Sequence, residues 1–170
     1  MHTVVYIMSS GTIETKCFCT VSCSLQHNAP AILAYLFPPM NDIVLESIHT
    51  IHFLSDSPSG QYRNKSMFLF LANHLKIILQ NYQEVGHGKG VPDGIGGVGK
   101  CTADRMVAQG SDLPDMDTLI NVLQQNCLGV KIFSLSKTEI EKISEVIEKW
   151  KVLPVKGTVK VSKNLNRLRL

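Results

Sequence analysis

SIHTIHFLSDSPSGQYRNK, residues 47 to 65, carries three kinds of local structure in succession. Ser47 to Leu54 predicts a β-strand, because β-branched and aromatic residues alternate along it. The Ser, Asp, Pro and Gly residues that follow are typical of a turn. From Gln61 to about Gln80 we expect one long buried helix, whose apolar positions nearly encircle it. A strand that leads through a turn into a helix predicts an α/β fold.

The pattern on either side of this stretch supports a mixed α/β domain. A weak strand over 81–85 precedes a glycine-rich loop, and a basic tail over 151–170 follows the single domain over 1–150. The other predicted elements are strands at His2–Met8 and Lys16–Ser22 joined as a hairpin, a helix from Asn28 stopped by Pro38 and Pro39, a helix from about Gly97 to Gln109, a late strand over 130–135, and a helix opened by a capping box at Ser136 and Glu139.

The composition bounds the class of protein. A chain of 170 residues with 44% hydrophobic and 18% charged residues is typical of one globular domain rather than a disordered segment. The longest apolar stretch, Met67 to Leu79, is too short and too polar to span a bilayer, so no membrane partner is expected. The net charge is +3, and residues 149–170 hold seven Lys or Arg and no acidic residue. These basic residues are compatible with an anionic partner such as DNA.

Five cysteines, at positions 17, 19, 23, 101 and 127, form an odd set with no paired spacing. This usage predicts a reducing, intracellular compartment and free thiols, most of them buried. Cys17, Cys19 and Cys23 are spaced in a way that zinc sites also show. Because Cys17 and Cys19 fall on a predicted strand, packing in the core is the favoured interpretation.

The glycine-rich segment Gly94 to Thr102 admits a nucleotide-binding interpretation. Gly94, Gly99 and Lys100 match the outer frame of a loop whose backbone N–H groups and Lys bind phosphates. However, the position after the Lys is Cys101 instead of a hydroxyl residue, and no buried strand leads into the loop. A nucleotide-binding protein therefore stays an alternative.

Two acidic residues suggest a different chemistry. Asp56 follows the predicted strand directly, and Asp93 lies just before a predicted helix, with His87 and Lys89 close to it in the sequence. Two such carboxylates can hold Mg²⁺ or Mn²⁺, and a metal pair can clamp a phosphodiester during its cleavage. His87 is a candidate for proton transfer and Lys89 for phosphate contact. The alternative is that both acids are turn and helix-cap residues.

Polar residues at the start of the helix after Asp56 are further candidates for phosphate binding. A helix N-terminus attracts anions, and the side chains there would add to that attraction. A solvated polar turn explains the same residues equally well. The candidates are Gln61, Arg63, Asn64 and Lys65.

Four segments of the chain form distinctive motifs. They are Ser22-Cys-Ser-Leu-Gln-His27, His52-Phe-Leu-Ser-Asp-Ser-Pro-Ser-Gly-Gln-Tyr-Arg-Asn-Lys65, His87-Gly-Lys-Gly-Val-Pro-Asp-Gly-Ile-Gly-Gly97 and, near the end, Pro154-Val-Lys-Gly-Thr158. In this order they resemble segments of a group of animal proteins that look like domesticated or decayed DNA transposons. The resemblance covers nearly the whole chain. It implies a ribonuclease-H-like (DDE-type) transposase core, in which carboxylates at the ends of central strands bind two metals for strand cleavage and transfer.

Under this resemblance Asp56 would be the second catalytic acid and Asp93 the third. The first acid would lie on a strand ahead of the Met1–Ser22 hairpin, so the chain resembles a core that lacks its first strand. Ser57 and the segment Asn81-Tyr82-Gln83 also depart from the pattern of the group. We therefore expect a transposase-derived, nuclear protein that is degenerate or inactive alone. A non-catalytic nucleic-acid-binding remnant that uses Lys89, Lys100, Arg105 and the tail is the alternative, and homo-oligomerisation stays open.

Overall fold

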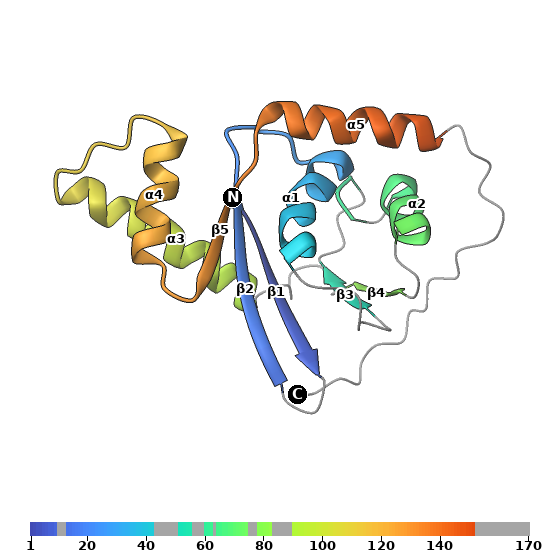
Figure 1. The fold of residues 1–170 in the computed structure, drawn as a ribbon, viewed down its shortest axis with the longest axis horizontal. Helices are drawn as coiled ribbons and strands as arrows, with labels where there is room; N and C mark the ends of the chain where they lie inside the picture. The colour runs from blue at the N-terminus through green and yellow to red at the C-terminus, as the bar shows by residue number, and fades with distance from the viewer. Residues whose placement is uncertain are drawn as a thin grey trace.

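The computed structural model describes residues 1–9, 13–42, 51–55, 60–62, 64–74, 78–82 and 90–151. These residues form a mixed α/β structure, as predicted (Figure 1). The strands are β1 (His2–Ser9), β2 (Ile13–Val21), β3 (Ile51–Ser55), β4 (Ile78–Tyr82) and β5 (Val130–Ser134). The helices are α1 (Ala29–Asp42), α2 (Lys65–His74), α3 (Val91–Ala108), α4 (Met116–Asn126) and α5 (Lys137–Lys151).

The larger sheet has the strand order β1-β2-β5. β1 and β2 pair antiparallel with Val5 opposite Cys17, which confirms the predicted hairpin. β5 pairs parallel with β2, with Ile132 opposite Cys19, and confirms the predicted late strand. A parallel pair requires a long crossover connection. Here the connection from β2 to β5 contains β3, β4 and the helices α1 to α4. β5 therefore lies beside the N-terminal hairpin although it comes late in the sequence.

The smaller sheet is the parallel pair β3–β4, in register from Ile51 opposite Ile78 to Ser55 opposite Tyr82. The prediction of one helix from Gln61 to about Gln80 is therefore wrong. α2 spans Lys65–His74, and the chain is in a strand again from Ile78. A continuous apolar run fits a buried helix and a buried strand equally well, and here pairing with β3 makes the residues from Ile78 onward a strand.

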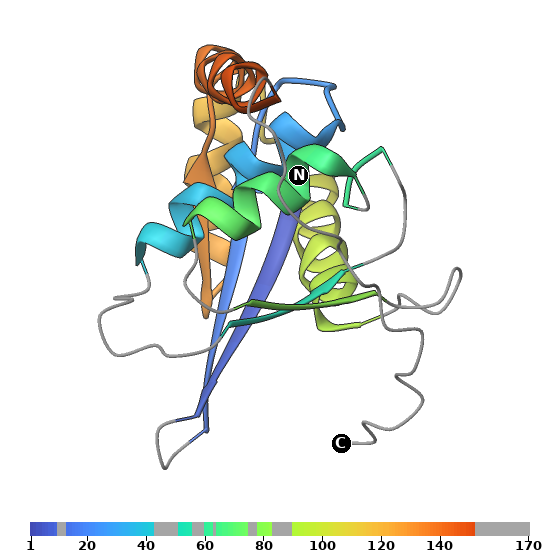
Figure 2. The same cartoon turned by 90° about the vertical axis from the view of Figure 1, so that its right-hand side faces the viewer.

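Helices cover both faces of the larger sheet. The faces are distinguished by alternation along β2, because successive side chains of a strand point to opposite sides. The Thr20 hydroxyl donates a hydrogen bond of 3.1 Å to the carbonyl oxygen of Tyr35 in α1, while Cys19 and Val21 pack in a cluster with α4. α3 packs on β1 and on α4. Figure 2, which looks along α5, shows α1 and α2 beneath that helix.

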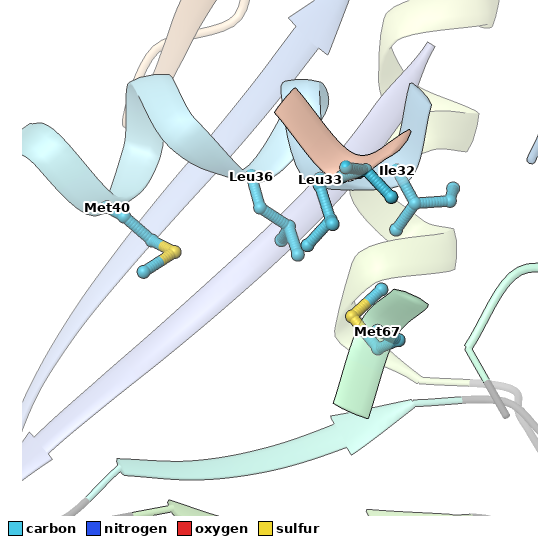
Figure 3. Close-up of a cluster of buried hydrophobic side chains, with 6 residues drawn as sticks. Ile32, Leu33, Leu36, Met40 and Met67 are labelled. Atoms are coloured by element: carbon cyan, nitrogen blue, oxygen red, sulfur yellow. The ribbon is translucent and has the colours of Figure 1, made fainter. Parts of the chain in front are cut away.

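One hydrophobic cluster joins the helices on the α1 side of the sheet. Figure 3 shows Ile32, Leu33, Leu36 and Met40 of α1 together with Met67 of α2. Ile147 of α5, which is fully buried, completes the cluster. Three of the α1 residues, at positions 32, 36 and 40, recur at intervals of four, so they lie on one side of the helix. This side of α1 is the one that α2 and α5 cover.

The prediction that Pro38 and Pro39 stop α1 is wrong, because the helix continues through both residues to Asp42. Proline inside a helix removes a hydrogen bond and crowds the preceding turn, at a cost of roughly 3 kcal/mol. Burial beyond the prolines offsets this cost: Pro39 is buried, and Met40 is 7% exposed in the cluster with Met67. Tertiary packing therefore overrides the local signal.

Side-chain caps define the starts of several helices. The predicted capping box of α5 is confirmed: the Glu139 Oε2 accepts hydrogen bonds from the backbone N–H of Ser136 at 2.7 Å and from its hydroxyl at 2.6 Å. α4, which the sequence analysis did not predict, begins after Asp115, whose Oδ1 accepts a bond of 2.8 Å from the N–H of Thr118. Hydrogen bonds from the backbone N–H and then from the side chain of Thr118 hold the pKa of the Asp115 carboxyl below its usual value.

Candidate functional site

Asp93, the candidate third acid, lies in the first turn of α3, and its side chain bonds back to the N-cap residue Gly90. Its Oδ2 accepts a hydrogen bond of 3.0 Å from the backbone N–H of Gly90, and the side chain is exposed to solvent. The carboxylate thereby satisfies one of the N–H groups that a helix start leaves without an intrahelical partner. The cap-residue alternative for Asp93 is thus the role that the geometry supports.

The residues proposed to surround Asp93 lie outside the described part of the chain. These are Asp56, His87 and Lys89, together with Arg63 of the proposed phosphate-binding turn. β3 ends at Ser55, so Asp56 follows a strand directly, as the sequence predicted. The pairing of Asp56 with Asp93 stays a prediction.

The polar residues before α2 prepare the start of that helix. Asn64 Oδ1 accepts a hydrogen bond of 3.0 Å from the N–H of Met67, the geometry of an N-cap. Gln61 is half-buried in the preceding turn, and Lys65, the first residue of α2, is exposed. The Asn64 side chain is therefore engaged in capping, while the Lys65 ammonium is accessible to an anionic partner.

The glycine-rich segment Gly94 to Thr102 is helical throughout, which confirms the predicted helix from Gly97 onward and shows that the predicted loop is wrong for Gly94 to Gly96. α3 begins at Val91 instead of near Gly97. Pro92 suits a helix start, since its missing N–H would have no partner there and its φ angle is already helical. The N–H groups of Asp93 and Gly94 both donate to the carbonyl oxygen of Gly90, at 3.1 and 3.2 Å. Backbone N–H groups in this helix are thus not gathered around a common point, as phosphate binding would require.

The hydroxyl of Thr102 is also unsuited to the magnesium-binding role. The residue is 5% exposed, and its Oγ1 accepts a weak hydrogen bond from the thiol of Cys127, with 3.8 Å between the sulfur and oxygen atoms. Lys100, two positions earlier, is exposed on the other side of the helix. α3 therefore separates the Lys and the hydroxyl that a phosphate loop would combine.

The basic candidates on α3 share their surface with acids. Lys100 and Arg105 are both exposed, and so are Asp93 and Asp104. The two positive and two negative side chains of α3 therefore cancel in net charge. Positive charge on this face comes in single side chains and does not form a continuous basic patch.

The five cysteines are all free thiols. Cys19 and Cys127 are buried, but Cys23 and Cys101 are exposed, so the expectation that most are buried is wrong. The pKa of the Cys19 thiol is raised to about 11, mainly because the thiol is buried away from water. The positive charge of the amino terminus lowers this pKa in part, and Cys127 raises it further. Cys19 is thus a packing residue that stays protonated at neutral pH.

The described ranges contain no group of three or more His, Cys, Asp or Glu residues that could hold a metal ion. Of the two predicted metal ligands, Asp56 and Asp93, the described ranges include Asp93. One of its carboxylate oxygens accepts the hydrogen bond from the N–H of Gly90. The two-metal site that the resemblance implies therefore stays a prediction. Among the described helices, none is long and apolar enough to cross a membrane.

A comparison with protein families yields one match that spans nearly the whole chain. A family model described as a domain of unknown function (DUF8701) matches residues 1–164. No curated protein and no solved structure matches the chain.

Proposed function

We propose that the chain, which belongs to the DUF8701 domain family, is a transposase-derived domain of ribonuclease-H-like type that binds DNA without cleaving it. Its ancestral activity would be the metal-dependent cleavage and transfer of DNA strands. The observation that carries the proposal is the succession of an antiparallel hairpin, a helix and a parallel β–α–β unit whose first strand ends directly before Asp56.

The separation of the two sheets supports the ribonuclease-H-like part of the proposal. β1 is the edge strand of the larger sheet, and β3 pairs only with β4 among the described strands. α1 and α3 both pack on β1. In a ribonuclease-H-like arrangement, a further strand along β1 would join the two sheets into one.

The role of Asp93 supports the loss of cleavage. A two-metal site needs several carboxylates that converge on the metals. Asp93 instead accepts a hydrogen bond from Gly90, and no cluster of metal-binding residues occurs in the described ranges. These observations support a domain that binds DNA without cleaving it.

Retained DNA binding rests on accessible basic side chains. Lys65, Lys100 and Arg105 are exposed, and Lys89 and the basic tail add charge at positions outside the described residues. Contacts of this kind are made to phosphates and carry little sequence information. We expect weak, salt-sensitive and largely sequence-independent binding to duplex DNA.

The proposal is tested by incubating the full chain with supercoiled plasmid and Mg²⁺ or Mn²⁺ and then separating the DNA on gels with and without protein removal. The expected result is a mobility shift that disappears when the protein is removed, with the plasmid still supercoiled. Nicked or linear DNA from the wild type, absent with the Asp56→Asn variant, would overturn the loss of cleavage. The absence of any shift at low salt would overturn DNA binding.

A further inference from the structure

α3 presents a line of exposed residues whose spacing places them on one side of the helix. Asp93, Gly97, Lys100 and Asp104 follow one another at intervals of four, three and four residues, and all four are exposed. Residues at such intervals are neighbours on a helix surface. The buried residues Gly99 and Thr102 lie on the opposite side, which packs on the rest of the domain.

Gly97 has no packing role inside the described chain. A Cβ atom added there would meet nothing within 4 Å, whereas one added at Gly99 would lie 3.1 Å from the sulfur of Met1. Glycine in the middle of a helix costs roughly 0.5–1 kcal/mol relative to alanine. Gly99 is explained by the close approach of Met1. Gly94 and Gly97 both lack such a neighbour, and of the two only Gly97 lies on the line of exposed residues.

The charges beside Gly97 are self-complementary. Asp93 and Lys100 flank it along the helix and are two turns apart. The two ion pairs formed with carboxylates within the described residues are Lys16–Glu14 and Lys131–Asp42, so Lys100 and Asp93 keep their charges available. If two copies of α3 are placed antiparallel and cross at Gly97, each Asp93 faces the Lys100 of the other copy.

We propose that this side of α3 is a self-association surface, through which two copies of the chain pair antiparallel about a two-fold axis next to Gly97. The glycine allows the two backbones to approach closely, and two equivalent Asp93–Lys100 contacts set the register. An interface of this kind is isologous, since the same patch is used by both copies. Val98, which is 52% exposed beside the crossing point, would be partly covered. The inference does not depend on the proposed DNA binding.

The size of the contact predicts how strong the association is. One pair of helices buries less surface than a standard stable interface, so the dimer should form reversibly in the micromolar range or above. The ion pairs lie at the surface and contribute little energy individually. Their main effect is to exclude other registers, since like charges would meet in a parallel or shifted arrangement.

The association is tested by sedimentation equilibrium of the full chain, without DNA, over a range of concentrations. We expect the mass to rise from that of the 18.8 kDa monomer towards twice that value. Lys100→Glu should shift the rise to concentrations at least tenfold higher, because it places four acidic side chains at the contact. The matched variant Lys142→Glu, on the exposed side of α5, should leave the curve unchanged. A monomeric mass at all concentrations would overturn the proposal, as would equal effects of the two variants.

A second test examines the crossing point. In a background where the exposed Cys23 and Cys101 are replaced by Ser, Gly97→Cys should form a disulfide-linked dimer under mild oxidation, while Glu141→Cys on α5 should not. Circular dichroism checks that the variants fold, and the open space at Gly97 predicts that they do. Equal crosslinking at both positions would contradict the proposed register. If Lys100→Glu weakened DNA binding in a protein that is always monomeric, the face would serve DNA and not a second copy.

Discussion

The Asp93 carboxylate, in the first turn of α3, accepts a hydrogen bond of 3.0 Å from the backbone N–H of Gly90, the residue directly before the helix. A carboxylate in the first turn is also favoured by the helix dipole. The residue to which the resemblance assigns metal binding therefore also stabilises the start of this helix. The two roles make different predictions for the same substitution.

Asp93→Ala should lower the free energy of unfolding by about 0.3–1.5 kcal/mol, the range for a helix cap with its favourable charge. Asp104→Ala, an exposed position in the same helix, should change it by less than about 0.5 kcal/mol. Urea unfolding followed by circular dichroism measures both. If the Asp93 variant were as stable as the wild type in the absence of metal, the capping role would be wrong.

The capping box of α5 predicts a pH dependence of stability. Hydrogen bonds from the Ser136 hydroxyl, and then from its backbone N–H, hold the pKa of the Glu139 carboxyl below its usual value. Because the folded-state pKa is lowered, the stabilisation is complete above the usual carboxyl pKa of about 4.3. It is lost as the pH falls through the lower folded-state value.

At pH 6 the Glu139→Gln variant should therefore be less stable than the wild type, and this difference should become smaller as the pH falls to 3. Ser136→Ala should lower the free energy of unfolding by about 0.5–2 kcal/mol at pH 7. Unfolding midpoints across this pH range provide the measurement. A difference between wild type and Glu139→Gln that grows on acidification would have the opposite sign and would contradict the assignment.

The packing of α4 on the larger sheet should contribute strongly to stability. Leu123 is fully buried in the cluster with Cys19 and Ile132, whereas Leu128 is 89% exposed two residues after the helix. Leu123→Ala should lower the free energy of unfolding by about 2–5 kcal/mol. Leu128→Ala should change it by less than about 0.5 kcal/mol. Similar losses for both variants would mean that α4 does not pack on the sheet as described.

These elements illustrate what can be predicted from the sequence. The β1–β2 hairpin, β5 and the start of α5 follow from local signals, namely alternation along strands and a capping box. α4 carried comparable signals, Asp115 as a cap and apolar residues at helical spacing, and was predictable although it was missed. Local physics determines elements of this kind.

Other features depend on contacts distant in sequence. α1 continues through Pro38 and Pro39 because Met40 packs against α2, and β4 exists because β3 pairs with it. The helical state of Gly94 to Thr102 rests on the cap at Gly90 and on burial of Gly99 against Met1 and Leu123. For the candidate site, the sequence correctly placed Asp56 after a strand. It could not decide between the metal and cap roles of Asp93.

The thiols should differ in reactivity according to burial. Cys23 and Cys101 are exposed, whereas Cys19 is buried and its pKa is raised to about 11. Because the thiolate is the reactive form, Cys19 should resist iodoacetamide at neutral pH in the folded protein and react only after unfolding. Mass spectrometry of labelled peptides assigns the sites. Labelling of Cys19 as fast as that of Cys23 would show that β2 is not covered by α4.

We expect the exposed cations of α3 to contribute to the proposed DNA binding. Lys100→Glu with Arg105→Glu should weaken binding about equally for unrelated duplex sequences, because phosphate contacts carry no sequence information. The matched substitution Lys142→Glu with Lys137→Glu, at exposed positions of α5, should have a smaller effect. If both pairs reduced affinity equally, the effect would reflect total charge and not a site on α3.

The proposed DNA binding is measured by fluorescence anisotropy of a labelled duplex titrated with the full chain at several salt concentrations. We expect measurable binding at low salt and a logarithm of the affinity that falls linearly with the logarithm of the salt concentration. Each phosphate contact contributes a slope of about −0.9. No binding at low salt, or binding that does not change with salt, would contradict it.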